Sequence, residues 1–161
     1  KRLGKKKQKW VAKNTAQSFE AVSEAALEFS RQGLTLEETL KRTNDALVLT
    51  RLTGLKAADS VKGLTAAVNG FGKAGLTTTQ IINKLSAVDT KFAVGTDDLI
   101  NALGRAGAVA QDAGVSFDEL VALVTVAQQK TARGGAVIGN AFKTIYTRMQ
   151  DPKALNAICR R

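Results

Sequence analysis

Apolar residues recur along most of the chain at alternating steps of four and three positions, the spacing that places side chains on one face of an α-helix. Six segments show this pattern, with apolar residues Phe19, Val22, Ala26 and Phe29; Leu36, Leu40 and Leu47; Ala57, Val61, Leu64, Val68 and Phe71; Ile81, Leu85, Val88 and Phe92; Leu99, Leu103, Ala106 and Ala110; and Ile138, Phe142, Ile145 and Met149. The first of these helices is predicted to begin at Asn14. A further segment, from Phe117 to Ala127, is apolar on nearly every side, which is typical of a helix enclosed by other helices.

Short polar motifs mark where several of these helices begin. Thr35–Glu38, Thr77–Gln80 and Ser116–Glu119 each have the capping-box pattern, in which a hydroxyl residue and a Glu or Gln three positions later accept hydrogen bonds from each other's backbone N–H. The third motif predicts a helix that begins at Phe117. Thr96–Asp98 is expected to cap another helix, with its acids at the positive end of the helix dipole.

Glycines are expected to end most of these helices. Gly33, Gly75, Gly95 and Gly114 each stand one or two positions before a hydroxyl residue that can start the next helix. The first interval between these glycines is much longer than the other two, which is too irregular for a strict solenoid. Short connections favour antiparallel packing of sequence neighbours. The prediction is an all-α fold, a compact bundle or array of about seven short antiparallel helices joined by glycine-containing turns.

Composition agrees with a folded helical domain but gives an uneven distribution of charge. The chain has 161 residues, of which 44% are hydrophobic and 24% charged, and its formal net charge is +10. The excess is confined to the ends. Residues 1–13 contain no acid and seven basic residues, which are Lys1, Arg2, Lys5, Lys6, Lys7, Lys9 and Lys13. Arg160 and Arg161 add two more basic residues, and the rest of the chain is close to neutral.

These features divide the chain into three parts. Residues 1–13 form a basic arm or the end of a preceding helix, residues 14–150 form the helical core, and residues 151–161 form a basic tail. The chain begins with Lys1 rather than methionine, and it stops within a helical pattern around Cys159. We therefore expect the tail to continue into a longer protein.

The residue types that carry most enzymatic chemistry are scarce. The sequence has no histidine, and Cys159 is its only cysteine, so neither a disulfide within the chain nor a cysteine-rich metal site can form. Three acid pairs, at residues 37–38, 97–98 and 118–119, lie in first helical turns, where capping and the helix dipole explain them better than acid–base catalysis. No catalytic residue, metal ligand or cofactor is assigned, and we expect a protein that is not an enzyme.

Two glycine-rich motifs resemble nucleotide-binding loops. Gly70–Gly75 has the spacing GxGxxG, with Asp89 at the distance of a ribose ligand, but an amphipathic helix rather than a strand precedes it. Glycines 134 and 139 have phosphate-loop spacing, but Asn140–Ala141 occupy the positions of the Lys and the Ser or Thr that such a loop requires. We interpret the second cluster as helix-packing glycines, namely Gly134, Gly135 and Gly139, with Gly134–Gly135 as a hinge.

Five segments in order resemble the core region of the tail tape-measure proteins of long-tailed bacteriophages and prophages. They are Gly33–Leu40, Ala67–Gly72, Gly95–Leu99, Ala113–Leu120 and Gly134–Phe142. Each segment alone is an ordinary pattern for the end or start of a helix. The specificity lies in the ordered set, which covers residues 18–150.

The resemblance implies a structural component of the phage tail that acts in tail assembly, tail length determination and genome ejection. It implies a location in the tail lumen of the virion and in the host cytoplasm during assembly. The implied partners are further copies of the protein, the tail tube, the tail tip or baseplate, and tail-assembly chaperones, with DNA or the host membrane as further partners during ejection. Coiled-coil helices are typical of such a protein.

Two alternative functions rest on other features. The basic segment 1–13 with Trp10 is consistent with a helical module that binds nucleic acid. Small residues spaced along Ala102, Ala106 and Ala110, and again at Gly135 and Gly139, are consistent with a membrane-active helical segment used at ejection.

Overall fold

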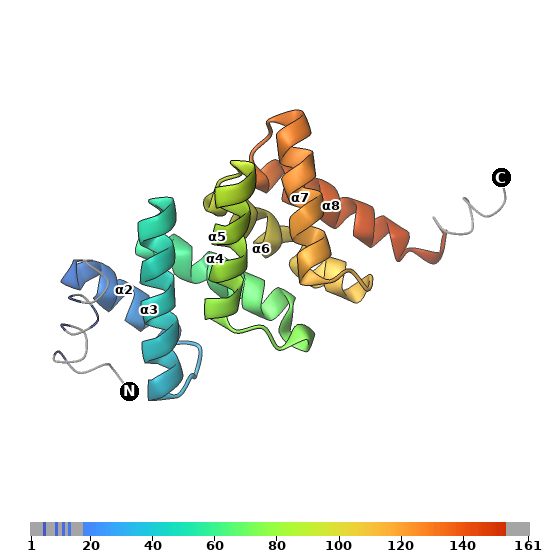
Figure 1. Ribbon diagram of the computed structural model, residues 1–161. Helices are drawn as coiled ribbons and strands as arrows, with labels where there is room; N and C mark the ends of the chain where they lie inside the picture. Colours follow the sequence, from blue (N-terminus) through green and yellow to red (C-terminus); the bar gives the residue numbers. More distant parts are fainter. Residues whose placement is uncertain (1–4, 6–8, 10, 12, 14–17, 154–161) are drawn as a thin grey trace. The chain divides into compact units, whose positions relative to one another are not determined.

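The computed structural model describes residues 18–153 together with Lys5, Lys9, Val11 and Lys13 (Figure 1). Residues 18–153 form seven α-helices and one short 3-10 helix, without a strand. The elements are α2 Phe19–Ser30, α3 Leu36–Thr53, α4 Ala57–Gly70, η1 Gly72–Ala74, α5 Thr78–Phe92, α6 Thr96–Asp112, α7 Phe117–Thr131 and α8 Gly135–Met149. The predicted all-α array of about seven helices is confirmed. The predicted helix start at Asn14 lies outside the described residues.

The chain divides into two compact units, residues 1–64 and residues 65–161, and α4 crosses the boundary between them. In the first unit α2 packs against α3. Phe29 and Leu47 are fully buried in this unit. The Thr50 hydroxyl lies 2.9 Å from Ser60 Oγ and forms a hydrogen bond that joins α3 to the first turn of α4.

The buried face of α3 only partly matches the predicted stripe of Leu36, Leu40 and Leu47. Leu36 is 42% exposed, whereas Thr39, Thr43 and Leu47 are buried. The Thr43 hydroxyl donates to the carbonyl oxygen of Thr39 at 2.6 Å. A threonine can occupy a core position when its hydroxyl returns a hydrogen bond to its own helix backbone. The helix is therefore rotated relative to the orientation that leucine spacing alone suggests.

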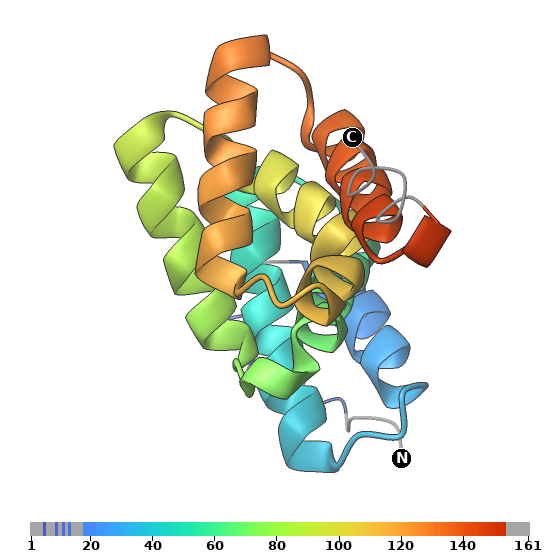
Figure 2. The same cartoon turned by 90° about the vertical axis from the view of Figure 1, so that its right-hand side faces the viewer.

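The second unit has two layers of helices. Figure 2 shows α5 and α7 running side by side, and α6 contacts α5, α7 and α8. Large apolar residues fill the space between the layers, including Leu85, Leu99, Leu103 and Leu120, all of them fully buried. The Phe71 ring, which follows α4, meets the Phe117 ring edge to face at 5.2 Å.

The prediction that other helices enclose α7 is wrong. Leu120 and Val124 of α7 are fully buried, but Leu123 is 43% exposed and Val126 is 55% exposed. Within the described part of the chain, packed helices cover only one side of α7 because it lies in the outer layer of a two-layer unit. The predicted core positions Ile145 and Met149 of α8 are exposed as well.

Three successive helix pairs between residues 33 and 149 repeat one local structure: α3–α4, α5–α6 and α7–α8. Each pair follows a glycine with positive φ, at Gly33 (73°), Gly75 (65°) and Gly114 (84°). Each first helix starts with a capping box and is followed by a residue in the left-handed region, at Gly54 (72°), Ala93 (51°) and Ala132 (52°).

This repeat corrects the interpretation of irregular glycine spacing. The interval from Gly33 to Gly75 is nearly equal to the interval from Gly75 to Gly114, and each of these glycines precedes a pair. Gly95 does not start a pair. It is the N-cap of α6, in the turn that joins the two helices of the second pair, and its φ is −57° rather than positive. The repeating unit is therefore two helices long, and it is nearly regular.

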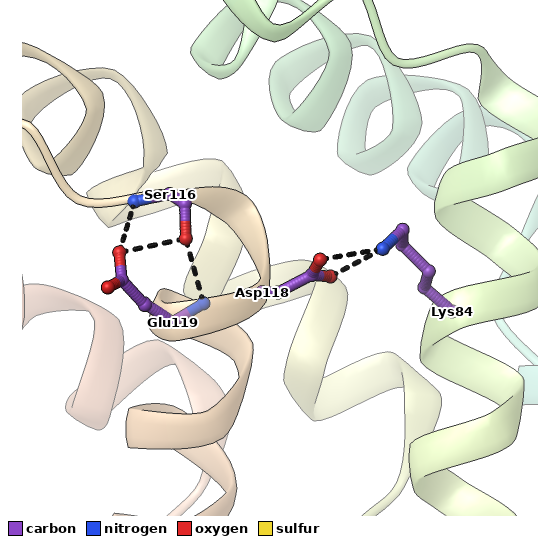
Figure 3. Close-up of polar contacts among 4 residues, drawn as sticks. All are labelled: Lys84, Ser116, Asp118 and Glu119. Atoms are coloured by element: carbon purple, nitrogen blue, oxygen red, sulfur yellow. Dashed lines mark hydrogen bonds and ion pairs between the residues drawn. The ribbon is translucent and has the colours of Figure 1, made fainter.

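The capping box of α7 shows how each first helix begins (Figure 3). Ser116 Oγ accepts from the Glu119 backbone N–H at 3.3 Å, and the Glu119 carboxylate accepts from the Ser116 backbone N–H at 2.8 Å. The neighbouring residue in the first turn, Asp118, forms an ion pair with Lys84 of α5 at 2.7 Å. That pair is exposed to solvent, so its contribution to stability is small.

We expect the Ser116→Ala substitution to raise the pKa of Glu119 part of the way to its ordinary value. Hydrogen bonds from the Ser116 backbone N–H and then from its hydroxyl favour the charged carboxylate and lower the pKa of Glu119. Because the folded pKa is lower than the unfolded one, the resulting stabilisation is present above the ordinary pKa and is lost as pH falls through the lowered value. Carboxyl chemical shifts followed by NMR through an acid titration measure the change.

A matched control is Thr35→Ala, which removes the hydroxyl that lowers the pKa of Glu38 in α3. It should raise the pKa of Glu38 and leave that of Glu119 unchanged. An unaltered Glu119 titration in Ser116→Ala would show that the capping box does not exist in solution.

Candidate functional site

Helix α6, the end of α7 and the start of α8 meet through a set of polar contacts. We call it the Asp98 junction and define it by Asp98, Gln128 and Gly135. Asp98 lies in the first turn of α6, which begins at Thr96. Gln128 lies in the last turns of α7, and Gly135 is the first residue of α8.

A single carboxylate connects the three helices. Asp98 Oδ1 accepts from the backbone N–H of Gly135 at 2.6 Å, and Asp98 Oδ2 accepts from the side-chain amide of Gln128. The N-cap of α8 is Gly134, which has no side chain to supply this acceptor. Asp98 therefore caps a helix that is not its own. A negative charge at this position also interacts favourably with the positive end of the α8 dipole.

The prediction that Thr96–Asp98 caps its own helix is wrong. The N-cap of α6 is Gly95, which makes no side-chain hydrogen bond. The acceptor instead comes from α5, where Asp89 Oδ2 accepts from the Thr96 backbone N–H at 3.2 Å and from the Thr96 hydroxyl at 2.8 Å. Both α6 and α8 therefore have a glycine as N-cap, and in each the first backbone N–H of the helix donates to a carboxylate on another helix.

The backbones of α6 and α8 touch beside this carboxylate. A Cβ atom on Gly135 would overlap the carbonyl oxygen of Asp98, and one on Gly139 would lie 2.8 Å from the Cα atom of Ala102. Gly134 is different, since the nearest atom to its Cβ position is Asp98 Oδ1 at 3.5 Å. Of the three glycines interpreted as packing residues, Gly135 and Gly139 lie at the backbone contact and Gly134 forms the N-cap.

Polar and aromatic contacts continue the α6–α8 interface away from the junction. The Arg105 guanidinium donates to Asn140 Oδ1 at 3.2 Å, and the Gln150 amide donates to the carbonyl oxygen of Val109 at 3.3 Å. On α8 the Tyr146 ring stacks on Phe142, with 6.0 Å between the ring centres. Burial raises the pKa of Tyr146. The two helices are therefore in contact over several turns.

The basic residues near the N-terminus belong to the first unit. The Lys5, Lys9 and Lys13 side chains are exposed. The other predicted anion contacts at positions 1, 2, 6 and 7, and the arginines at 160 and 161, lie outside the described residues. The structure therefore gives no common surface for the complete basic set.

The remaining candidate motifs have structural roles in the part of the chain that is described. Gly70 ends α4 and Gly72 begins η1, so a helix and not a strand precedes the GxGxxG motif. Asp89, at the ribose-ligand distance, instead caps α6. The described residues contain no cluster of acidic or cysteine side chains that could hold a metal ion. In the same residues no helix is both long and apolar enough to cross a membrane.

Comparison with known protein families identifies the family of the chain. A family model described as "Phage-related minor tail protein" matches residues 4–158. The chain belongs to this family. No solved structure matches the chain. Membership of the phage-related minor tail proteins favours a structural role in a phage tail and association with the virion.

Sequence patterns alone miss two members of the Asp98 junction in this minor tail protein. Asp98 has the local pattern of a first-turn acid, but its partners lie 30 and 37 residues away along the chain. Gln128 has no distinguishing local signal. The one available signal is the pair of glycines at 134 and 135, because an N-cap without a side chain needs an acceptor from elsewhere.

We expect Gly135→Ala to destabilise the protein by about 1 to 3 kcal/mol, because the added carbon overlaps the backbone of α6 and the two helices must separate. Gly134→Ala is the matched control. It adds the same carbon one residue earlier, where the nearest atom lies at 3.5 Å. Urea denaturation of both variants measures the free energy of unfolding. Equal midpoints for the two variants would contradict the close backbone contact.

Proposed function

We propose that this minor tail protein is a tape-measure segment of a long-tailed phage. In this role it acts in tail assembly, in the determination of tail length and in genome ejection. The observation that carries the proposal is the family match over residues 4–158. The ordered motifs that resemble tape-measure proteins cover nearly the same part of the chain and supply the finer assignment.

The helix lengths define what kind of segment this is. An uninterrupted α-helix grows by about 1.5 Å per residue, which makes it suitable as a ruler. The helices here contain 12 to 18 residues, and α8 folds back against α6. A chain that turns back on itself adds much less length per residue than a rod. We infer that this segment is a folded module at one position of the ruler, where it anchors or starts assembly.

The partners follow from this role. A folded anchor in the tail lumen would contact further copies of the protein, the tail tube, the tail tip or baseplate and the assembly chaperones. DNA or the host membrane would be contacted during ejection. The apolar side chains that the second unit leaves exposed, such as Leu123 and Val126 of α7, support protein contacts of this kind.

The test is made in a phage or prophage that encodes the protein, by measuring tail length in electron micrographs. One variant carries a second copy of residues 75–113 after Pro152, which adds one helix pair. The matched control carries an uninterrupted helix with the same number of residues at the same place. The control should lengthen the tail by about 58 Å, at about 1.5 Å per residue, whereas the additional helix pair should change the length by much less.

The ruler assignment, the folded module and the structural role in the tail can each fail separately. A control insertion that leaves tail length unchanged would contradict the ruler assignment. Equal lengthening by the two insertions would contradict the folded module. Normal tails assembled without the protein would contradict a structural role in the tail.

A further inference from the structure

A groove lies between the start of α7 and the end of α8, and we call it the α7–α8 groove. Its lining includes Val115 in the turn before α7, Glu119 and Leu123 of α7, and Tyr146 of α8, and its volume is about 570 Å³. Glu119 is the one charged residue among those that line it. Leu123 is 43% exposed, although burial of a leucine side chain is favourable. The described residues thus leave open an apolar groove that carries one acid.

One helix pair earlier, the first turn of α7 occupies the corresponding place. Helices α5 and α7 contain 15 residues each and both begin with a capping box, so Lys84 of α5 corresponds to Leu123 of α7. Lys84 forms its ion pair with Asp118, in the first turn of α7 (Figure 3). The side chain at this position of α5 therefore faces the helix that starts the following pair.

The other side of the groove gives the same result. Tyr146 of α8 corresponds to Gly107 of α6, because each stands equally far from the glycine N-cap of its helix. A Cβ atom on Gly107 would lie 3.0 Å from the Phe71 ring, and that ring meets the ring of Phe117, the first residue of α7. Both counterparts therefore lie near the start of a first helix.

A new helix begins in the chain directly after α8. Asp151 Oδ1 accepts from the Lys153 backbone N–H at 2.9 Å, and residues 152 and 153 are helical. This bond is that of an N-cap, and proline, here Pro152, is favoured at the first position of a helix. A residue before proline is driven out of the helical region, so Asp151 separates the new helix from α8.

The chain leaves α8 beside the groove. The Gln150 amide donates to the carbonyl oxygen of Val109, near the end of α6, at 3.3 Å. Ala113, directly after α6, lines the groove, and so does Tyr146, which lies about one helical turn before Gln150. A segment joined to Lys153 is therefore held close to the groove, at an effective concentration on the order of millimolar. An untethered molecule at lower concentration competes poorly with such a segment.

The sequence of residues 152–161 suits this place. Leu155, the fourth residue of the new helix, corresponds to Leu120 of α7, which is fully buried. Cys159 follows four positions later, a spacing that keeps two side chains on one side of a helix. The segment contains three basic residues and no acid, which complements Glu119 in the groove.

We propose that residues 154–161 continue the helix that begins at Pro152, and that this helix docks in the α7–α8 groove as the first helix of a further pair. Leu155 and Cys159 then enter the groove, and Leu123 becomes buried. The array continues by the same packing that joins α7 to α5 and α6. The proposal concerns the packing of the chain and does not depend on the tape-measure role.

The test measures the alkylation rate of Cys159, the only thiol of the chain. The matched reference is a synthetic peptide of residues 152–161, in which the same thiol has the same sequence neighbours but no groove. We expect the full chain to react about tenfold more slowly or slower still, because alkylation then requires the docked helix to open. Equal rates for the chain and the peptide would overturn the proposal.

Two variants of the full chain show whether the groove protects the thiol. Leu123→Glu places a second acid in the groove, four residues from Glu119, and burial of its charge would be costly. Leu155→Asn removes the apolar side chain of the segment and leaves the described helices unchanged. Each variant should bring the alkylation rate back toward that of the peptide.

Leu52→Glu is the matched control, because Leu52 is 50% exposed and lies in the first unit. It should leave the alkylation rate unchanged. Protection that survives Leu123→Glu, or that Leu52→Glu also removes, would overturn the proposal. Protection that increases with protein concentration would overturn it too, because a second copy would then be the occupant.

Discussion

The structure of the second unit depends on one contact, in which the start of α8 lies against the backbone of α6 with the Asp98 carboxylate between them. The carboxylate accepts a hydrogen bond from the first residue of α8, Gly135, and holds the end of α7 through Gln128. The absence of a Cβ atom on Gly135 allows the backbones to touch. The close fit at Gly135 and the charge of Asp98 therefore act at the same place. Together they fix the position of α8 against α6.

Features that are determined within a few residues could be predicted from the sequence. The capping boxes that begin at Thr35, Thr77 and Ser116 were predictable because donor and acceptor are three residues apart and need no other part of the chain. The close spacing of Gly135 and Gly139 likewise suggested packing, although their partner could not be known. The cap of α8 could not be predicted, since Asp98 resembles any acid in a first helical turn.

The incorrect expectations share a physical cause, which is that burial depends on the neighbours of a helix rather than on the helix alone. Leu36 is exposed while Thr43 is buried, because threonine can satisfy its hydroxyl within its own helix. Helix α7 is apolar on several sides, but only one side has packed neighbours in the described part of the chain. Glycine spacing was misleading because Gly95 lies within a helix pair, a fact that only its backbone conformation reveals.

The Asp98 junction lies between two successive helix pairs of the repeat, α5–α6 and α7–α8. In the second unit α8 meets the preceding pair through Gly135 and Gly139 and leaves Val137, Ile145 and Met149 exposed. In arrays of helical repeats the terminal repeat usually has a polar outer face, so the exposed apolar side chains of α8 are atypical of a terminal repeat.

The most direct test of this account compares the free energies of unfolding of Asp98→Ala and Asp97→Ala. Both substitutions remove one negative charge from the first turn of α6, but only Asp98 bonds to Gly135 and Gln128. The account predicts a loss of about 1.5 to 3 kcal/mol for Asp98→Ala, as for a hydrogen bond to a charged group. For Asp97→Ala it predicts a loss of about 0.3 to 1 kcal/mol, from the helix dipole alone. Equal losses would show that Asp98 does no more than any acid at the start of a helix.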